Sequence, residues 1–325
     1  MRKLLMIIFL FAALIARAQN FEYKVLFEGI GDNREFFNDY GFPQTILGAR
    51  AAAEGGFSVE NHKFRLGFSY LYEFGSEFDA QKPNPILYYQ FNNSKIDFLF
   101  GAFSRRNKID FPLAMITDTL LYYRPNIEGL YGKYNWKWGW QNGFVDWVQR
   151  QTDVNREIFT AGSSGQMFAG PFFVENFLLI SHVALPGIRV EGQQIEDYLG
   201  CSFLAGFRTK ENNSFRGYLK AGILNSAYRK RNVTDGFLIA NSFFAEAFGQ
   251  WKSLALKTVL HSGEGHRFSF GDSFYHAENY SRTDFIWSFI NMEKIKGHFN
   301  WSFHVIDWQE LNHQQQVSII YVFGK

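Results

Sequence analysis

The sequence predicts an all-β fold: a transmembrane, antiparallel, up-and-down β-barrel of about sixteen strands, within a range of roughly fourteen to eighteen. Three observations lead to this prediction. The chain begins with an export signal, continues through a long series of segments that alternate between apolar and polar residues, and joins these segments by links that are alternately long and short. No soluble fold class requires all three together.

The first eighteen residues have the composition of a cleavable export signal. Two basic residues precede an apolar stretch over 4–15, and the triplet Ala-Arg-Ala at 16–18 fits the small-x-small pattern that signal peptidase cleaves. Residues 1–18 are therefore predicted to be a secretory signal peptide. The mature chain, 19–325, begins near Gln19 and works outside the cytoplasm.

The composition favours strands that face lipid. Aromatic residues make up 19% of the 325 residues, with 38 Phe, 16 Tyr and 8 Trp, against 7 Pro and 1 Cys. Such residues favour strands and form the lipid-facing belts of membrane barrels. The mean hydropathy of -0.20 fits a barrel, since only half of each strand's side chains face lipid. The net charge of +2 gives no indication of nucleic-acid binding.

The clearest strand covers 63–75, where large apolar residues occupy every second position from Phe64 to Phe74 and alternate with small or charged residues such as Arg65 and Glu73. A two-residue period with one wholly apolar face is what lipid outside and a wet lumen inside impose. The same period predicts sixteen strands, centred on 20–29, 46–59, 62–75, 85–92, 94–104, 127–133, 138–149, 156–167, 171–184, 198–208, 215–226, 235–249, 252–262, 281–292, 296–307 and 315–324.

The links between these strands alternate in length. Even-numbered links are short, such as Glu60-Asn61 and Asn92-Asn93. Long extracellular loops and tight periplasmic turns produce this rhythm in an up-and-down barrel. The longer, odd-numbered links are 30–45, 76–84, 105–126, 150–155, 185–197, 227–234, 263–280 and 308–314.

With its signal, alternating strands, loop rhythm and aromatic final strand, the chain resembles a Gram-negative outer-membrane β-barrel of the porin type over 19–325. It departs from that pattern at its end, because Gly324 and Lys325 follow Phe323. The resemblance implies location in the bacterial outer membrane, export through a cleaved signal peptide, and contact with outer-membrane lipid and with the barrel-assembly machinery. It also implies transport of small hydrophilic solutes, with no cofactor and no nucleic-acid partner.

If the large apolar residues mark the lipid face, the opposite faces give the lumen. Charges on a lipid face near the midplane cost roughly 2–4 kcal/mol for Arg or Lys, so inward placement supports this register. A hydrated pore is one interpretation, and a narrow barrel filled by its own paired charges is the other. The predicted pore-lining residues are Arg50, Glu54, Arg65, Glu73, Lys95, Asp97, Arg105, Asp146, Arg208, Arg216, Lys220, Glu246 and Lys257.

The link over 105–126 is the third long one, and its middle, from Phe111 to Ile116, is apolar. In porins the third extracellular loop folds into the lumen and narrows it, which implies the same for this link. An apolar middle has to be buried somewhere, so packing over the rim or against a partner is the alternative. The candidate constriction residues are Arg106, Lys108, Asp110, Asp118 and Arg124.

The sequence offers only fragments of a catalytic site. Neither HExxH nor G-x-S-x-G occurs. His298 and His304 share one strand face, but six residues place them roughly 20 Å apart, too far for one metal ion. A membrane hydrolase could use a Ser/His/acid set from the loop after Leu260. That loop carries His261, Ser262, Glu264, His266, Asp272 and His276.

We therefore predict a channel for passive diffusion of small hydrophilic solutes. Eight inner cations against five inner acids predict a slight anion preference, because fixed charge concentrates counter-ions. The chain is predicted not to be an enzyme and to carry neither a catalytic nor a metal site. A non-conducting barrel that acts as a binding or assembly component is one alternative, and a lipid-modifying hydrolase of the outer membrane is another.

Overall fold

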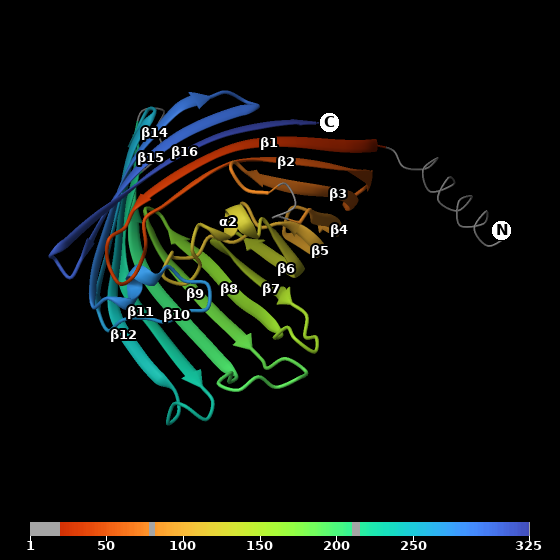
Figure 1. The fold of residues 1–325 in the computed structure, drawn as a ribbon. Coiled ribbons are helices and arrows are strands. Elements are labelled where there is room, and N and C mark those ends of the chain that lie inside the picture. The colour runs from red at the N-terminus through yellow and green to blue at the C-terminus, as the bar shows by residue number, and fades with distance from the viewer. Residues whose placement is uncertain (1–19, 78–81, 210–214, 325) are drawn as a thin grey trace.

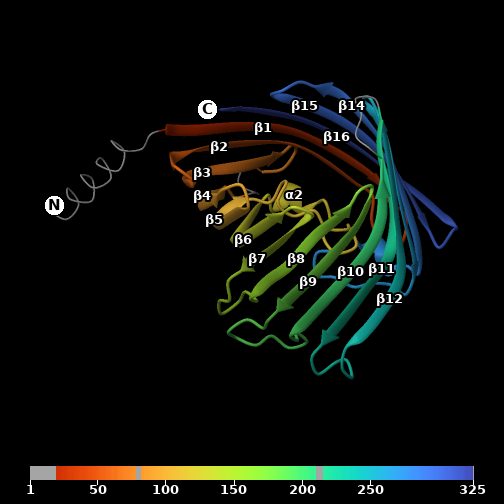
Figure 2. The same cartoon turned by 180° about the vertical axis from the view of Figure 1, so that it is seen from behind.

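The computed structural model describes residues 20–77, 82–209 and 215–324, so the predicted signal peptide at 1–18 lies outside the described residues. Sixteen strands form one closed antiparallel barrel, which confirms the predicted fold class and strand count (Figures 1 and 2). The strands are β1 (Asn20–Glu35), β2 (Gln44–Val59), β3 (His62–Glu73), β4 (Asn84–Asn92), β5 (Ile96–Ser104), β6 (Asn126–Trp136), β7 (Gly139–Gln149), β8 (Ile158–Ala169), β9 (Phe172–Val183), β10 (Glu196–Arg208), β11 (Phe215–Lys230), β12 (Leu238–Trp251), β13 (Leu254–Gly263), β14 (Asn279–Asn291), β15 (Ile295–Ile306) and β16 (Glu310–Gly324).

Each strand pairs with its neighbours in sequence, and β1 closes the barrel by pairing with β16. Every strand therefore has two partners, and no strand edge remains open to other chains. Two short helices lie in the links, α2 (Leu120–Tyr123) and the 3₁₀ helix η1 (Ser273–His276). Within the described ranges, no helix is long and apolar enough to cross a membrane.

The strands have one apolar outer face and one polar inner face, as β3 shows. Phe64, Leu66 and Phe68 are 58–67% exposed on the outside, whereas Arg65 and Ser69 are 7% and 3% exposed. The register predicted for this strand is therefore confirmed. A shift by one residue would place Arg65 on the outer face.

Two boundaries differ most from the sequence prediction. β1 continues to Glu35, six residues beyond the predicted strand end, and the last link shrinks to 307–309 because β16 begins at Glu310. Both differences have the same physical reason. Near the mouth of the barrel the added residues, such as Asp32 and Gln314, are polar but still pair in the ladder, so hydrophobic alternation does not reveal them.

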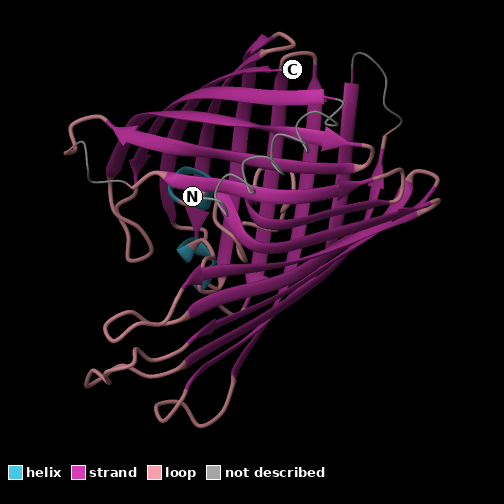
Figure 3. Ribbon diagram, turned by 90° about the vertical axis from the view of Figure 1, so that its right-hand side faces the viewer, coloured by secondary structure: helices cyan, strands magenta, loops and turns pink. Residues whose placement is uncertain are grey.

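The two ends of the barrel differ, and we name them by their links. The turn end carries short turns such as 60–61 and 170–171, and the long-link end carries links such as 105–125 and 264–278. A side view shows the strongly tilted strands and the links that extend from one end (Figure 3). The link 105–125, with α2, enters the interior of the barrel (Figure 1).

Candidate functional site

The charged residues predicted to line the lumen mostly lie on inner faces, where they are paired. Desolvated charges require such partners. Glu73 accepts a hydrogen bond from the Tyr123 hydroxyl at 2.9 Å. The ion pairs that involve predicted lining residues are Arg50 with Glu28, Arg65 with Glu22, Lys24 with Glu54, Arg105 with Asp146, Lys108 with Asp97, Lys220 with both Glu175 and Glu246, and Lys257 with Glu246.

Three predicted lining residues lie elsewhere or differ in their surroundings. Lys95 belongs to the exposed turn before β5 and is not on an inner strand face. Arg208 and Arg216 lie at the turn end, where Arg208 stacks over the Phe168 ring at 4.0 Å and the Nε of Arg216 donates to Gln250 at 2.9 Å. Neither forms an ion pair with a carboxylate in the described part of the chain.

The third long link runs across the interior and is fixed to opposite walls. Arg106 pairs with Glu28 of β1 at 2.5 Å, and Lys108 pairs with Asp97 of β5. Asp118 lies 3.9 Å from Arg282 of β14. Of the remaining candidates, Asp110 lines the cavity described below, and the carbonyl of Arg124 accepts a hydrogen bond from the Arg105 Nε.

The third link meets the link between β13 and β14, and we call their contact the clasp, formed by residues 113–117 and 270–275. Ile116 and Phe270 form a parallel bridge, and the Thr117 N–H donates to the Phe270 carbonyl at 2.7 Å. The Asp272 N–H donates to the Leu113 carbonyl at 2.9 Å. Two loops distant in sequence are thereby joined inside the barrel.

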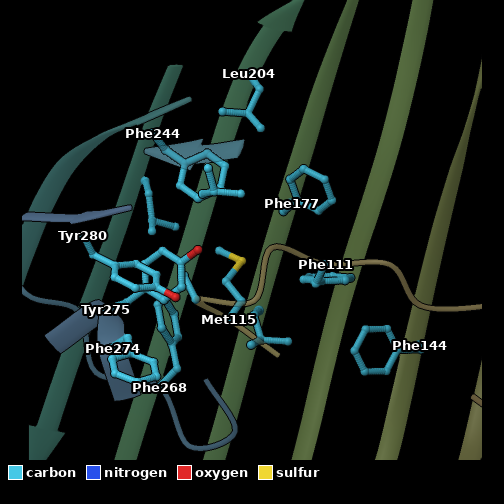
Figure 4. Close-up of a cluster of buried hydrophobic side chains, with 14 of the residues drawn as sticks. Phe111, Met115, Phe144, Phe177, Leu204, Phe244, Phe268, Phe274, Tyr275 and Tyr280 are labelled. Carbon is cyan, nitrogen blue, oxygen red and sulfur yellow. The ribbon is translucent and has the colours of Figure 1, made fainter. Parts of the chain in front are cut away.

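A cluster of buried apolar side chains attaches the clasp to the wall (Figure 4). Met115 is completely buried, and Phe111 packs against Phe144 and Phe177, with ring centroids 5.8 Å and 5.4 Å apart. The apolar middle of the third link is thus buried against inward-facing aromatic residues. These aromatic residues explain why a barrel interior here holds an apolar core.

A cavity of about 1370 Å³ lies between the clasp and the turn end of the barrel, and we call it the turn-end cavity. Residues of β7 to β14 form its walls, and residues 110–113 together with Tyr275 bound it at the clasp. Its opposite rim includes Gly170, Pro171 and Thr209, at the short turns. The cavity therefore extends from the turn end to the clasp.

The histidine-rich link contains one tight arrangement. His266 lies between Ser226 and Ser242, and each serine oxygen is 2.7 Å from one ring nitrogen. Burial lowers the pKa of His266 to about 3, so the ring is neutral at physiological pH. With both nitrogens occupied and the side chain 1% exposed, this histidine cannot reach a substrate.

The catalytic set suggested for this link does not assemble. Ser262 bonds Asn279 on the outer face, and Glu264 bonds Asn241 there. The Asp272 carboxylate accepts from the Phe274 N–H, at the start of η1. His276 is exposed. The arrangement of this link is structural.

A different constellation lies on the outer face at the long-link end. His182 of β9 and Asp197 of β10 are cross-strand partners, with 2.7 Å between Nδ1 and Oδ1. The other carboxylate oxygen lies 2.9 Å from Arg231 Nε and 3.3 Å from Arg229. One aspartate thus holds a histidine and two arginines together on the surface of the barrel, and we call these four residues the outer-face cluster.

The outer-face cluster is continued by aromatic residues and bordered by the apolar band. Phe159 is the cross-strand partner of His182, and their rings lie 5.5 Å apart. The next outer row, two residues or roughly 7 Å along the strands, is apolar, with Ile180 and Leu199 as cross-strand partners. The cluster therefore marks the boundary between the apolar band and the polar end of the barrel.

Sequence reasoning missed this site. The four residues come from three strands and one link, and no short motif joins them. A polar residue on the outer face of a predicted strand was the available signal, since His182 shares the face of Leu178 and Ile180. Among the described residues, no group of three or more His, Cys, Asp or Glu is placed to hold a metal ion.

The sequence model of the lipid A 3'-O-deacylase-type family matches residues 16–323. The chain belongs to this family. Its name is that of an enzyme family, so the prediction from the sequence that the chain is not an enzyme is wrong. The error came from requiring a known linear motif before expecting catalysis.

Solved structures support the porin-like fold. The chain is similar to a loop-deletion mutant of OmpT from Vibrio cholerae, with a TM-score of 0.57 and 10% identity over 94% of this chain and 100% of that one. The similarity to an anion-selective porin from Comamonas acidovorans has a TM-score of 0.55 and 10% identity, over 94% of this chain and 99% of that one. The similarity to OccAB3 from Acinetobacter baumannii has a TM-score of 0.52 and 10% identity, over 94% of this chain and 100% of that one. No curated protein matches the sequence.

These likenesses confirm the predicted resemblance to outer-membrane barrels of the porin type. At 10% identity they concern the fold alone, and they carry no residue roles to this chain. The family name indicates a reaction class, whereas the fold by itself indicates no function. The geometry of the chain's own residues has to locate the site.

Proposed function

We propose that the chain is a membrane-embedded hydrolase that removes an acyl chain from an acylated lipid of the lipid A type, and that the outer-face cluster is its active site. The observation that carries this proposal is the Asp197 carboxylate, which holds His182 and two arginines on the lipid-facing surface. Membership of the deacylase-type family supports the reaction class.

The position of the cluster suits an ester at the membrane interface. In an acylated lipid the ester bonds lie between the polar headgroup and the hydrocarbon. The His182 side chain is 24% exposed, directly above the apolar row that contains Ile180 and Leu199. An ester of an embedded lipid can therefore reach His182 while its acyl chain remains beside the apolar band.

The chemistry follows from the hydrogen bonds. Asp197 accepts the Nδ1 proton of His182, which fixes the tautomer and leaves Nε2 unprotonated. Nε2 can then take a proton from a water molecule as that water attacks the ester carbonyl. The proton subsequently passes to the leaving alkoxide, so the products are a free carboxylic acid and an alcohol.

The two arginines have two roles in this scheme. Their positive charges balance the Asp197 carboxylate, and in this scheme they would also stabilise the negative charge that develops on the carbonyl oxygen. Such preorganised charge is often the largest contribution to catalysis. Arg231 is 43% exposed and Arg229 is 32% exposed, so both can also approach a charged headgroup.

The test uses the folded mature chain in mixed micelles with purified lipid A, with mass spectrometry to detect the loss of one acyl chain. His182→Gln should reduce the rate by about 10²–10⁴-fold, as expected for loss of a general base. Asp197→Asn should reduce it too and change the pH profile. His313→Gln is the matched control, because His313 is also an outer-face histidine near the long-link end, and its ring is hydrogen-bonded to the amide of Gln315 and to no carboxylate among the described residues.

Two outcomes would refute the proposal. One is a folded wild-type protein that releases no acyl chain from lipid A or from a simple diacyl ester. The other is a His182→Gln variant that releases acyl chains as fast as the His313→Gln variant does. A heat-dependent shift in gel mobility shows that each variant is folded before its activity is compared.

A second candidate function is passage of small hydrophilic solutes with a slight anion preference, and the turn-end cavity favours it. The clasp would then control the path. Planar-bilayer conductance of the wild type and of Asp118→Asn, which weakens the contact with Arg282, tests this function. A larger conductance in the variant supports solute passage through the cavity. If neither protein conducts, this function is refuted.

A further inference from the structure

We propose that the turn-end cavity binds a small aromatic carboxylate, with Arg208 and Arg216 holding the carboxylate group and the aromatic wall beside them holding the ring. This site lies inside the barrel and is separate from the outer-face cluster. It does not rest on the proposed hydrolase function.

The rim of the cavity supplies the charge. Arg208 and Arg216 both line it, both are exposed, and neither has a carboxylate partner within the described ranges. The guanidinium carbon of Arg208 lies 4.0 Å from the centroid of the Phe168 ring, and Arg216 is oriented by Gln250. Two oriented guanidinium groups on adjacent strands form the donor arrangement that recognises a carboxylate.

The wall next to these arginines is aromatic. Tyr218 stacks on Phe248 at 5.3 Å and meets Phe173 edge-on at 6.5 Å. Gly206 makes this arrangement possible, since a Cβ at that position would lie 2.4 Å from the Phe173 ring. A flat ring can contact this wall by stacking or by edge-to-face packing.

The separation of charge and rings fits the ligand class. Tyr218 follows Arg216 by two residues on β11, a rise of roughly 7 Å, and is the cross-strand partner of Arg208. When a ligand's carboxylate lies between the two arginines, its aromatic ring therefore contacts this wall. This holds for a ring bonded directly to the carboxylate and for one separated from it by a single atom. An alkyl carboxylate would gain burial but not the ring contacts.

Deeper in the cavity every lining cation is paired with an acid, which confines the anion to the rim. Lys220 lies 2.9 Å from Glu175 and 3.3 Å from Glu246, and Lys257 lies 3.2 Å from Glu246. Arg282 is paired with Asp284 at 2.7 Å, and Asp110 also lines the cavity, so three cations meet four acids in its deeper part. Only the arginines at the rim leave positive charge for a ligand to meet.

The clasp bounds the far side of the cavity, where Phe111 and Leu113 of the third link line it. A ligand that enters from the turn end therefore meets a wall of apolar side chains. This arrangement retains a ligand, whereas a straight conduit would pass it on. Apolar pockets with a few placed polar groups are the usual form of small-molecule sites.

Isothermal titration calorimetry on the mature chain in nanodiscs tests the proposal with 1-naphthoate as the probe. The wild type should bind 1-naphthoate, and 1-naphthylmethylammonium, which has the same ring and the opposite charge, should bind at least tenfold more weakly. Arg208→Gln together with Arg216→Gln should weaken 1-naphthoate binding at least tenfold. Arg189→Gln, at an exposed arginine of the long-link end, should leave it unchanged.

A second variant separates the ring contacts from the charge. Phe173→Leu keeps both arginines but removes one ring of the wall, and it should weaken 1-naphthoate more than it weakens hexanoate. The proposal is overturned if the wild type does not bind 1-naphthoate. It is equally overturned if the ammonium compound binds as tightly, or if the double arginine variant binds like the wild type.

Discussion

Asp272 is expected to make the clasp sensitive to pH. Its N–H donates to the Leu113 carbonyl, and its carboxylate accepts from the Phe274 N–H at 3.1 Å. Burial removes water from the carboxylate and raises the pKa of Asp272 from 3.8 to about 6. The Phe274 hydrogen bond and the more distant Arg282 offset only part of this effect.

The sign of the pH dependence follows from the raised pKa. Between about pH 4 and pH 6 the closed clasp binds the proton more tightly than the open one, so the free energy of opening falls as the pH rises. Above pH 6 the contribution of this proton to the free energy of clasp opening is fully lost. A shift of about two units corresponds to at most about 3 kcal/mol of difference in proton binding between the closed and the open clasp.

Asp272→Asn tests this reasoning, since the amide oxygen still accepts from Phe274 but carries no charge. Hydrogen exchange measured by mass spectrometry over 105–125 and 264–278 reports clasp opening, after correction for the intrinsic exchange rate at each pH. Protection in the wild type should fall by up to roughly 100-fold between pH 4 and pH 7. In Asp272→Asn it should stay constant and exceed the wild-type value at pH 7.

Asp153→Asn serves as the control, because this carboxylate is exposed in the link between β7 and β8. It should leave the wild-type pH dependence intact. If wild-type protection does not change with pH, or if Asp272→Asn retains the full slope, burial of Asp272 does not control the clasp.

Two further predictions concern stability, measured as the free energy of unfolding by urea in detergent micelles. Met115→Ala should cost about 2–5 kcal/mol, since the side chain is fully buried in the apolar cluster, whereas the exposed Val154→Ala should change little; equal losses would show that the cluster does not stabilise the barrel. Gly101→Ala should cost more than about 1 kcal/mol, because Gly101 has a φ of +123° and its added Cβ would lie 2.1 Å from the Leu87 carbonyl oxygen. Gly132→Ala, with open space around the Cβ, is the matched control, and a neutral Gly101→Ala would contradict the steric argument.

The fold could be predicted from the sequence because the membrane imposes its rules on every strand. A lipid-facing position has to be apolar in β3 as in β15, so the two-residue period repeats along the whole chain. The rule weakens near the mouth of the barrel. There the strand pairing of Asp32 with Gln316 continues without an apolar face, and the predicted boundaries at β1 and β16 were wrong.

The candidate active site could not be predicted in the same way. His182, Asp197 and Arg229 are neighbours only because three strands share one register, and their separations in sequence carry no information about it. The search for a catalytic set instead examined one histidine-rich link. That link brings His266 to two serines but leaves it buried and without an acid.

The predicted anion preference rested on an incomplete charge count. Eight cations exceeded five acids because the count used only the clearer strands, and it omitted Glu22 and Glu28 of β1 and Glu175 of β9. These omitted acids pair with Arg65, Arg50 and Lys220 respectively. Lys95 drops from the count as well, since it lies in a turn.

Among the cations that line the turn-end cavity, those without an ion pair in the described part of the chain lie at its rim. Arg208 and Arg216 stand at the turn end, while the deeper cations are compensated by glutamates at 2.9–3.3 Å. Fixed charge acts on a passing ion over about one Debye length, roughly 8 Å at physiological ionic strength. Any selectivity should therefore arise at this rim, and Arg208→Glu together with Arg216→Glu should reverse it, whereas Arg50→Glu alone should mainly destabilise the pair with Glu28.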